Sequence, residues 1–71
     1  MPNFCVNKVA QSGSRDHEVH NLDVGTDCLP LAMNRLALGQ HPSCREAVAA
    51  AKSFYSDTNG CAYCAPECHT T

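Results

Sequence analysis

The 71-residue chain has no tryptophan and few aromatic residues of any kind. Its aromatic side chains are two phenylalanines and two tyrosines, Phe4, Phe54, Tyr55 and Tyr63. A chain of this length buries only about 60% of the surface that it exposes when unfolded, so an apolar core alone stabilises it weakly. Domains of this size usually add disulfides, a structural metal or a partner chain. We therefore expect one small domain over residues 1–71 that depends on such a cross-link.

The sequence also lacks the features of three broad classes of protein. No apolar run approaches the ~20 residues of a membrane span, so we expect no membrane association. The N-terminal segment carries no basic stretch followed by an apolar one, which predicts no signal peptide and a cytoplasmic location. Five Lys and Arg against seven Asp and Glu give a net charge of −2, and the basic residues are scattered. The charge therefore does not favour a nucleic-acid partner, and we expect another protein as the partner, with the oligomeric state left open.

Cysteine and histidine are, by contrast, abundant: the chain has six cysteines and four histidines. In a reducing compartment, clustered Cys and His bind metal more often than they form disulfides. An even number of cysteines also fits a framework of disulfides in an oxidising compartment. We favour the metal and keep the disulfides as the alternative.

The N-terminal third predicts a β-hairpin. Residues 3–9 are rich in β-branched and aromatic side chains, residues 11–14 form a turn, and residues 15–22 pair back as the second strand. In that strand His20 would share one face with Glu18, while Val19 would point to the other. A helical turn over the same residues is the alternative.

The rest of the chain predicts one main helix. Residues 31–38 have the composition of a short helix that Gly39 could end, although the run is short enough for a strand. The main capped helix is expected over residues 44–55, because Ser43 and Glu46 form a Ser-x-x-Glu capping box. The dipeptide at residues 59–60, Asn-Gly, is the strongest turn signal in the chain.

Two Cys/His pairs flank that helix. The pair His41-x2-Cys44 is followed after sixteen residues by Cys61-x2-Cys64, the spacing of a four-ligand zinc site built from two pairs. A two-residue gap lets a tight turn present both side chains to one ion. We expect a C-terminal zinc knuckle whose ligands are Cys44, Cys61 and Cys64, with the fourth drawn from His41, Cys68 and His69.

A second group of metal-binding residue types lies in the N-terminal half. Its members are Cys5, His17, His20 and Cys28. A second site of two cysteines and one or two histidines is one interpretation of this group. The interpretation we prefer is a polar strand whose histidines bond to the backbone, with Cys5 and Cys28 as a disulfide or as buried thiols.

Several short motifs carry a resemblance that spans nearly the whole chain. They are His-Glu-Val-His-Asn-Leu at 17–22, Leu-Gly-x-His-x-x-Cys at 38–44 and Gly-Cys-x-Tyr-Cys-x-x-x-Cys-His-Thr at 60–70. In these motifs the chain resembles a group of short bacterial Cys/His-rich proteins of uncharacterised function, which implies no activity or ligand set. A knuckle followed by a helix is also similar to treble-clef zinc folds, among them the His-Asn-His nucleases.

The sequence as a whole predicts a small α+β fold: an N-terminal hairpin, one main helix and a zinc knuckle. The function expected is that of a small bacterial zinc-binding accessory or interaction module with a structural zinc, and not an enzyme. A metal-dependent, His-Asn-His-like nuclease using His17 or His20 is the first alternative. A secreted protein held by disulfides is the second.

Overall fold

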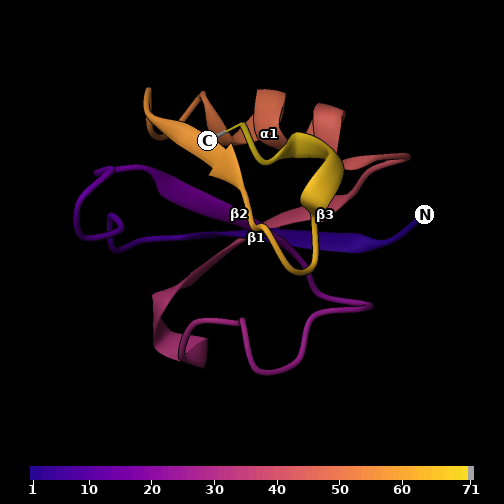
Figure 1. The fold of residues 1–71 in the computed structure, drawn as a ribbon. Helices are drawn as coiled ribbons and strands as arrows, with labels where there is room; N and C mark the ends of the chain where they lie inside the picture. The colour runs from indigo at the N-terminus through magenta and orange to yellow at the C-terminus, as the bar shows by residue number, and fades with distance from the viewer. Residues whose placement is uncertain (71) are drawn as a thin grey trace.

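The computed structural model describes residues 1–70. It shows a four-stranded mixed sheet with one α-helix on one face (Figure 1). The sheet order is β3-β1-β2-β4, with β1 antiparallel to both of its neighbours and β4 parallel to β2. This confirms the predicted small α+β fold class. The elements along the chain are β1 (Asn3–Asn7), β2 (His17–Asn21), the 3-10 helix η1 (Ala32–Asn34), β3 (Arg35–Gln40), α1 (Cys44–Ala51), β4 (Thr58–Gly60) and the 3-10 helix η2 (Pro66–Cys68).

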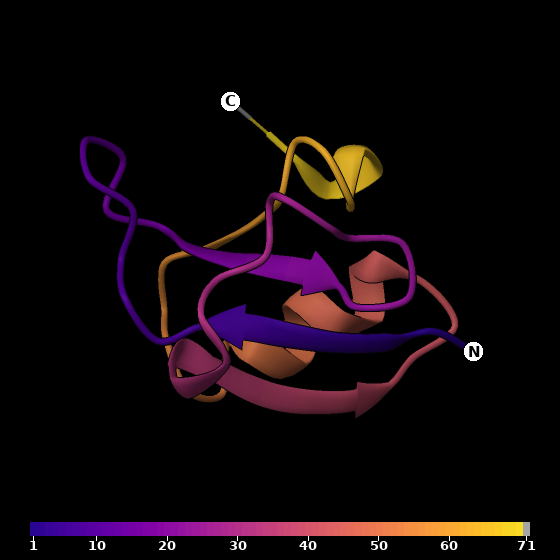
Figure 2. The same cartoon turned by 90° about the horizontal axis from the view of Figure 1, so that it is seen from below.

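The two faces of the sheet are covered differently. On one face, Phe4 and Val6 of β1 and Val19 of β2 are buried against α1 through Ala47 and Ala51, and they form the apolar core. Successive side chains of a strand point to opposite faces, so the alternating residues point away from α1. The segment from residue 22 to η1 crosses that second face, as the views from the side and from below show (Figures 1 and 2).

Residues 31–38 do not form the short helix that their composition predicts. Only the three residues of η1 are helical, and β3 begins directly afterwards at Arg35. β1 offers a free edge on which this stretch pairs, and Leu36 and Leu38 pack against the core. Gly39 has a positive φ of 82°, but it lies in β3 at an irregularity in the pairing with β1 and does not cap a helix.

Helix α1 begins where the sequence predicts and ends earlier. Ser43 is the N-cap residue, although its hydroxyl bonds to the Glu46 carboxylate and not to the backbone. The helix ends at Ala51 instead of near residue 55. Tyr55 leaves the helical path and stacks on the ring of His17, with ring centroids 3.8 Å apart. This contact with β2 outweighs the helix propensity of the preceding residues.

The Asn-Gly dipeptide at residues 59–60 is not a turn; it belongs to β4. Buried Asn59 accepts bonds from both the backbone N–H and the hydroxyl of Thr70, which ties the last described residues to this strand. Gly60 leaves room for η2: a Cβ there would lie 2.6 Å from the Cβ of Cys68. Parallel pairing with β2 and the close approach of η2 therefore override a strong local turn signal.

Candidate metal centre

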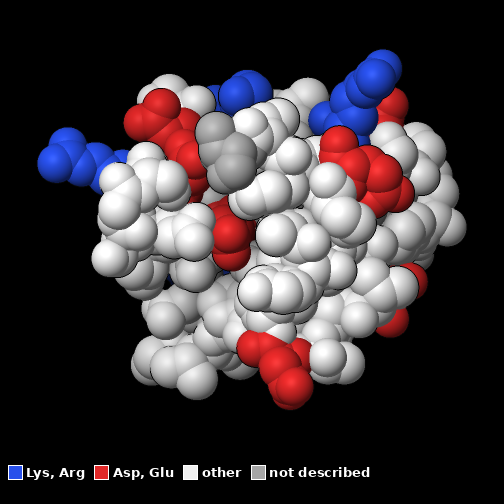
Figure 3. Space-filling view, in the orientation of Figure 1, with Lys and Arg blue, Asp and Glu red and all other residues white. Residues whose placement is uncertain are grey.

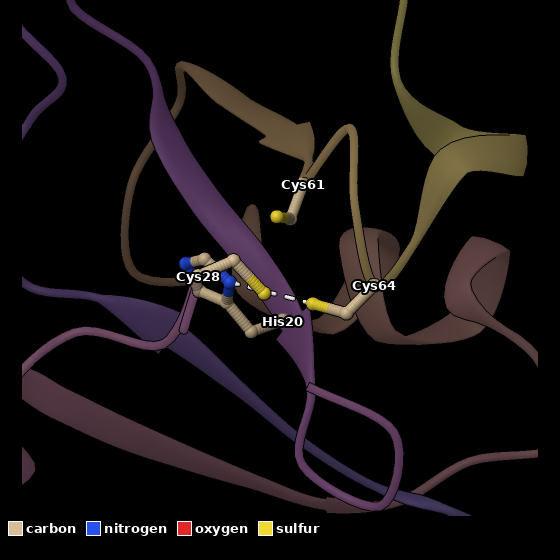
Figure 4. Close-up of side chains that lie close together, drawn as sticks. All are labelled: His20, Cys28, Cys61 and Cys64. Atoms are coloured by element: carbon tan, nitrogen blue, oxygen red, sulfur yellow. Dashed lines mark hydrogen bonds between the residues drawn. The ribbon is translucent and has the colours of Figure 1, made fainter. Parts of the chain in front are cut away.

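Four side chains converge on the side of β2 away from the apolar core. The Sγ atoms of Cys28, Cys61 and Cys64 and a ring nitrogen of His20 all lie within 4.8 Å of one another (Figure 4). A tetrahedral zinc site with bonds of about 2.3 Å places its ligand atoms about 3.8 Å apart. Shifts of about 1 Å would therefore bring all four atoms around one ion. This cluster can hold a metal ion, and we call it the His/Cys3 cluster.

Three segments far apart in the sequence build the cluster. His20 belongs to β2, Cys28 to the loop that crosses the second face, and Cys61 and Cys64 to the turn after β4. That turn is fixed to the sheet because the Cys61 N–H donates to the carbonyl of Val19 at 2.9 Å. The parallel pairing of β4 with β2 thus carries the turn to the side of His20.

Backbone N–H groups point at two of the sulfur atoms. The N–H of Tyr63 donates to Cys61 Sγ at 3.4 Å, and the N–H of Asn21 donates to Cys64 Sγ at 3.3 Å. Such bonds stabilise a thiolate more than a thiol, because the negative sulfur is the stronger acceptor. The arrangement suits sulfur atoms that act as metal ligands.

His20 is held in the form that binds metals. It is 1% exposed, and its burial, with a smaller contribution from the charge of Arg35, lowers its pKa. The neutral imidazole that results has a free ring lone pair. Nδ1 lies 3.5 Å from Cys64 Sγ, so this nitrogen faces the cluster.

Burial raises the pKa of the Cys64 thiol, and the neighbouring Cys28 and Cys61 raise it further. The Asn21 N–H lowers it, but by less than burial raises it. The surroundings of Cys64 in the protein alone therefore favour its protonated thiol. A bound cation reverses this preference, because it compensates the negative charges directly.

The structure brings only two of the predicted knuckle residues, Cys61 and Cys64, into the cluster. Cys44 and Cys68 form a disulfide that joins the start of α1 to η2. His41 Nε2 bonds to the carbonyl of Leu38 at 2.8 Å, and His69 Nδ1 bonds to the carbonyl of Gly60 at 3.1 Å. His20 and Cys28 take the places that the spacing had given to Cys44 and the fourth ligand.

The predicted second group is divided in the same way. His20 and Cys28 join the cluster, whereas His17 stacks on Tyr55 and its Nδ1 bonds to the carbonyl of Asn7 at 2.9 Å. Cys5 is a fully buried free thiol opposite His20 on β1, and burial raises its pKa. The two predicted sites thus contribute two residues each to one cluster. The alternation along β2 predicted that His20 and Val19 point to opposite faces, but no local signal placed β4 beside His20.

A hollow in the surface leads to the cluster. It has a volume of about 410 Å³ and is lined by Cys28 and Cys64 together with Val24, Gly25, Thr26, Asp27 and Tyr63. Cys28 is partly exposed, whereas Cys61 and Cys64 are buried. Ions in solution can therefore reach the sulfur atoms from this side.

The surface charge shows no basic stripe on the face seen in Figure 3, where the blue side chains stand apart near the edge. Among residues 1–70, no helix is long and apolar enough to cross a membrane. Comparisons with models of protein families, with curated proteins and with solved structures find no match for this chain.

Proposed function

We propose that the protein is a small module held together by a structural zinc ion, which His20, Cys28, Cys61 and Cys64 bind. The observation that carries the proposal is the convergence of four ligand atoms within 4.8 Å from three separate segments. It also fits the resemblance to short bacterial Cys/His-rich proteins, which we keep as part of the proposal.

Zinc suits this set of ligands best. Three thiolates and one imidazole are ligands of a borderline-soft ion, and Cys3His is one of the common sets in structural zinc sites. Hard cations such as calcium and magnesium take oxygen ligands, which the cluster does not offer. The backbone N–H groups that point at two sulfur atoms are consistent with thiolates that stay bound to one ion.

The structural role follows from what the cluster would connect. Among the described residues, only three large apolar side chains are fully buried in the core on the α1 face, Phe4, Val6 and Val19. On the opposite face a zinc ion would join β2, the loop that carries Cys28 and the turn after β4. A zinc site of this kind contributes on the order of 10 kcal/mol to folding, more than such a core supplies.

A closed site with four protein ligands leaves no position for a substrate, which favours a structural zinc over a nuclease. His17, the other histidine considered for nuclease chemistry, is occupied by the stack with Tyr55 and the bond to Asn7. We therefore propose that the module works by contact with another macromolecule, a protein in preference to a nucleic acid. Its net charge of −2 agrees with that choice.

We keep the cytoplasm as the proposed location, because unpaired thiols persist in a reducing compartment. Four cysteines are free among the described residues, namely Cys5, Cys28, Cys61 and Cys64. The Cys44–Cys68 disulfide is the feature that favours an oxidising compartment. A single disulfide also differs from the alternative in which all six cysteines pair.

Native mass spectrometry, on protein purified without added metal or reductant, tests the proposal. We expect one zinc ion per chain, lost on denaturation, and a denatured mass that corresponds to one disulfide and four free thiols. Cys64→Ser should lose the zinc, whereas Cys5→Ala, which removes a buried thiol outside the cluster, should keep it. A wild-type chain that takes up no zinc even when zinc is supplied refutes the proposal.

A further inference from the structure

The two ring nitrogens of His20 lie in different surroundings. Nδ1 faces the cluster, 3.5 Å from Cys64 Sγ. His20 as a whole is only 1% exposed, and its Nε2 is buried. Nevertheless, Nε2 has no hydrogen-bond partner among the described residues. Buried polar groups nearly always have a partner. The buried Nε2 therefore calls for a hydrogen-bond partner close by.

Glu18 is the residue placed to supply that contact. Its Oε1 lies 3.8 Å from His20 Nε2, just beyond hydrogen-bond distance, and its side chain is 21% exposed. Glu18 and His20 are two residues apart on β2, so their side chains project from the same face of the strand. Glu18 also pairs with Asn59 of β4, which fixes its backbone in the sheet. A small change in side-chain torsion would bring the carboxylate to Nε2.

Metal binding through Nδ1 would determine whether Nε2 carries a proton and therefore whether it requires an acceptor. A nitrogen that binds a cation carries no proton, so a neutral imidazole bound through Nδ1 must carry its proton on Nε2. That N–H requires an acceptor in a place where water does not reach. In metal sites a histidine ligand typically gives its second N–H to a carboxylate or a carbonyl, which fixes the ring and strengthens the ligand.

We propose that Glu18 is the positioning residue of the metal site: it accepts the Nε2–H of His20 and thereby holds Nδ1 toward the ion. This inference rests on the proposed function, because it gives Glu18 a role only in the metal-bound protein. Glu18 does not touch the ion; it acts through His20. The separation of 3.8 Å between Glu18 Oε1 and His20 Nε2 is short enough for a small side-chain movement to close it.

The test compares zinc affinities measured by competition with a chromophoric chelator. Glu18→Ala should weaken zinc binding by about 10- to 100-fold, the usual effect of losing such a partner. Glu18→Gln should recover part of the loss, because its amide oxygen still accepts the N–H. Glu67→Gln removes a negative charge from exposed η2, three residues from Cys64, and should leave the affinity unchanged.

A second measurement does not depend on any variant. Long-range 1H–15N NMR spectra of the zinc-loaded wild-type protein report which ring nitrogen of His20 carries the proton, and we expect Nε2. A proton on Nδ1 would overturn the inference, as would equal zinc affinities for the wild type and Glu18→Ala. Either result would leave the zinc site itself standing. A wild type that binds no zinc would instead remove the proposed function and this inference together.

Discussion

The stability of the protein should depend on the concentration of free zinc in a way that one bound ion predicts. A ligand that binds only the folded state stabilises it by RT ln(1 + [L]/Kd), about 1.4 kcal/mol for each tenfold rise in free zinc above Kd. At 1,000 times Kd the gain is about 4 kcal/mol. A domain of 71 residues has a total stability of only about 4–10 kcal/mol. Zinc should therefore supply a large part of it.

Urea and thermal unfolding in zinc buffers, followed by circular dichroism because the chain has no tryptophan, measure this dependence as a free energy and as a melting temperature. The range from no zinc to 1,000 times Kd should raise the melting temperature by roughly 16–32 °C, since 1 kcal/mol corresponds to about 4–8 °C for a domain of this size. The disulfide is kept intact throughout, so that only the metal varies.

Cys64→Ser is the variant that isolates the site. It replaces a buried sulfur that faces His20 Nδ1 by a smaller oxygen, and its stability should show no rise across the same zinc range. Cys5→Ala should keep the wild-type slope, because Cys5 lies outside the cluster. A wild-type stability that is independent of free zinc, or a slope that Cys64→Ser leaves intact, would refute the reasoning.

Three further predictions concern the framework around the site. Replacing Cys44 and Cys68 together by alanine removes a cross-link with a sequence separation of 24 and should lower the free energy of unfolding by about 3.5 kcal/mol in urea titrations, while zinc stoichiometry stays at one; an unchanged stability would contradict the pairing. Gly60→Ala places a Cβ 2.6 Å from Cys68 Cβ and 2.8 Å from the carbonyl oxygen of Ala65, so η2 must move, and we expect a loss on the order of 2 kcal/mol in the same titration; a neutral Gly60→Ala would show that η2 does not pack on β4. The bond from Ser43 lowers the pKa of Glu46 below its ordinary 4.5, so its contribution to stability is present above that pH and is lost as the pH falls through the lowered value; Ser43→Ala should raise the Glu46 pKa in an NMR titration, and an unchanged pKa would mean that the bond is absent in solution.

The features of the fold that depend on neighbouring residues could be predicted from the sequence. The start of α1 could be read from Ser43 and Glu46, because capping depends on neighbouring residues. Its end could not, since the stack of Tyr55 on His17 joins residues 38 positions apart in the sequence. The alternation of β2 correctly put Val19 and His20 on opposite faces of the strand, and the structure shows that the face of Val19 is the core face.

The sequence did not predict the two strands that form because a neighbouring strand offers an edge for pairing. Residues 35–40 are a strand because β1 offers an edge, and residues 58–60 are a strand because β2 offers another. Propensity alone favoured a helix in the first case and a turn in the second. Parallel pairing in particular leaves no signal between adjacent residues, because its partners are far apart along the chain.

The candidate site was likewise predictable only in the part that depends on neighbouring residues. The turn that presents Cys61 and Cys64 together follows from their two-residue spacing, and the structure has it. The partners of that pair depend on which strand lies beside β4, and spacing does not contain that information. The pair His41-x2-Cys44 has equally suitable spacing but flanks α1, where Cys44 meets Cys68 and His41 meets Leu38.

The distribution of the four cluster residues along the chain also sets the order in which the site can form. His20 and Cys28 leave the ribosome early, whereas Cys64 is made 44 residues after His20. A nascent chain that has reached only α1 therefore has two of the four cluster residues and cannot complete the proposed zinc site. Long-range contacts of this kind form late in folding, because the chain must first close a large loop. Under the proposed function, zinc uptake is thus a step that only a chain extended beyond β4 could complete, and zinc content would report whether synthesis and pairing of the last strand have succeeded.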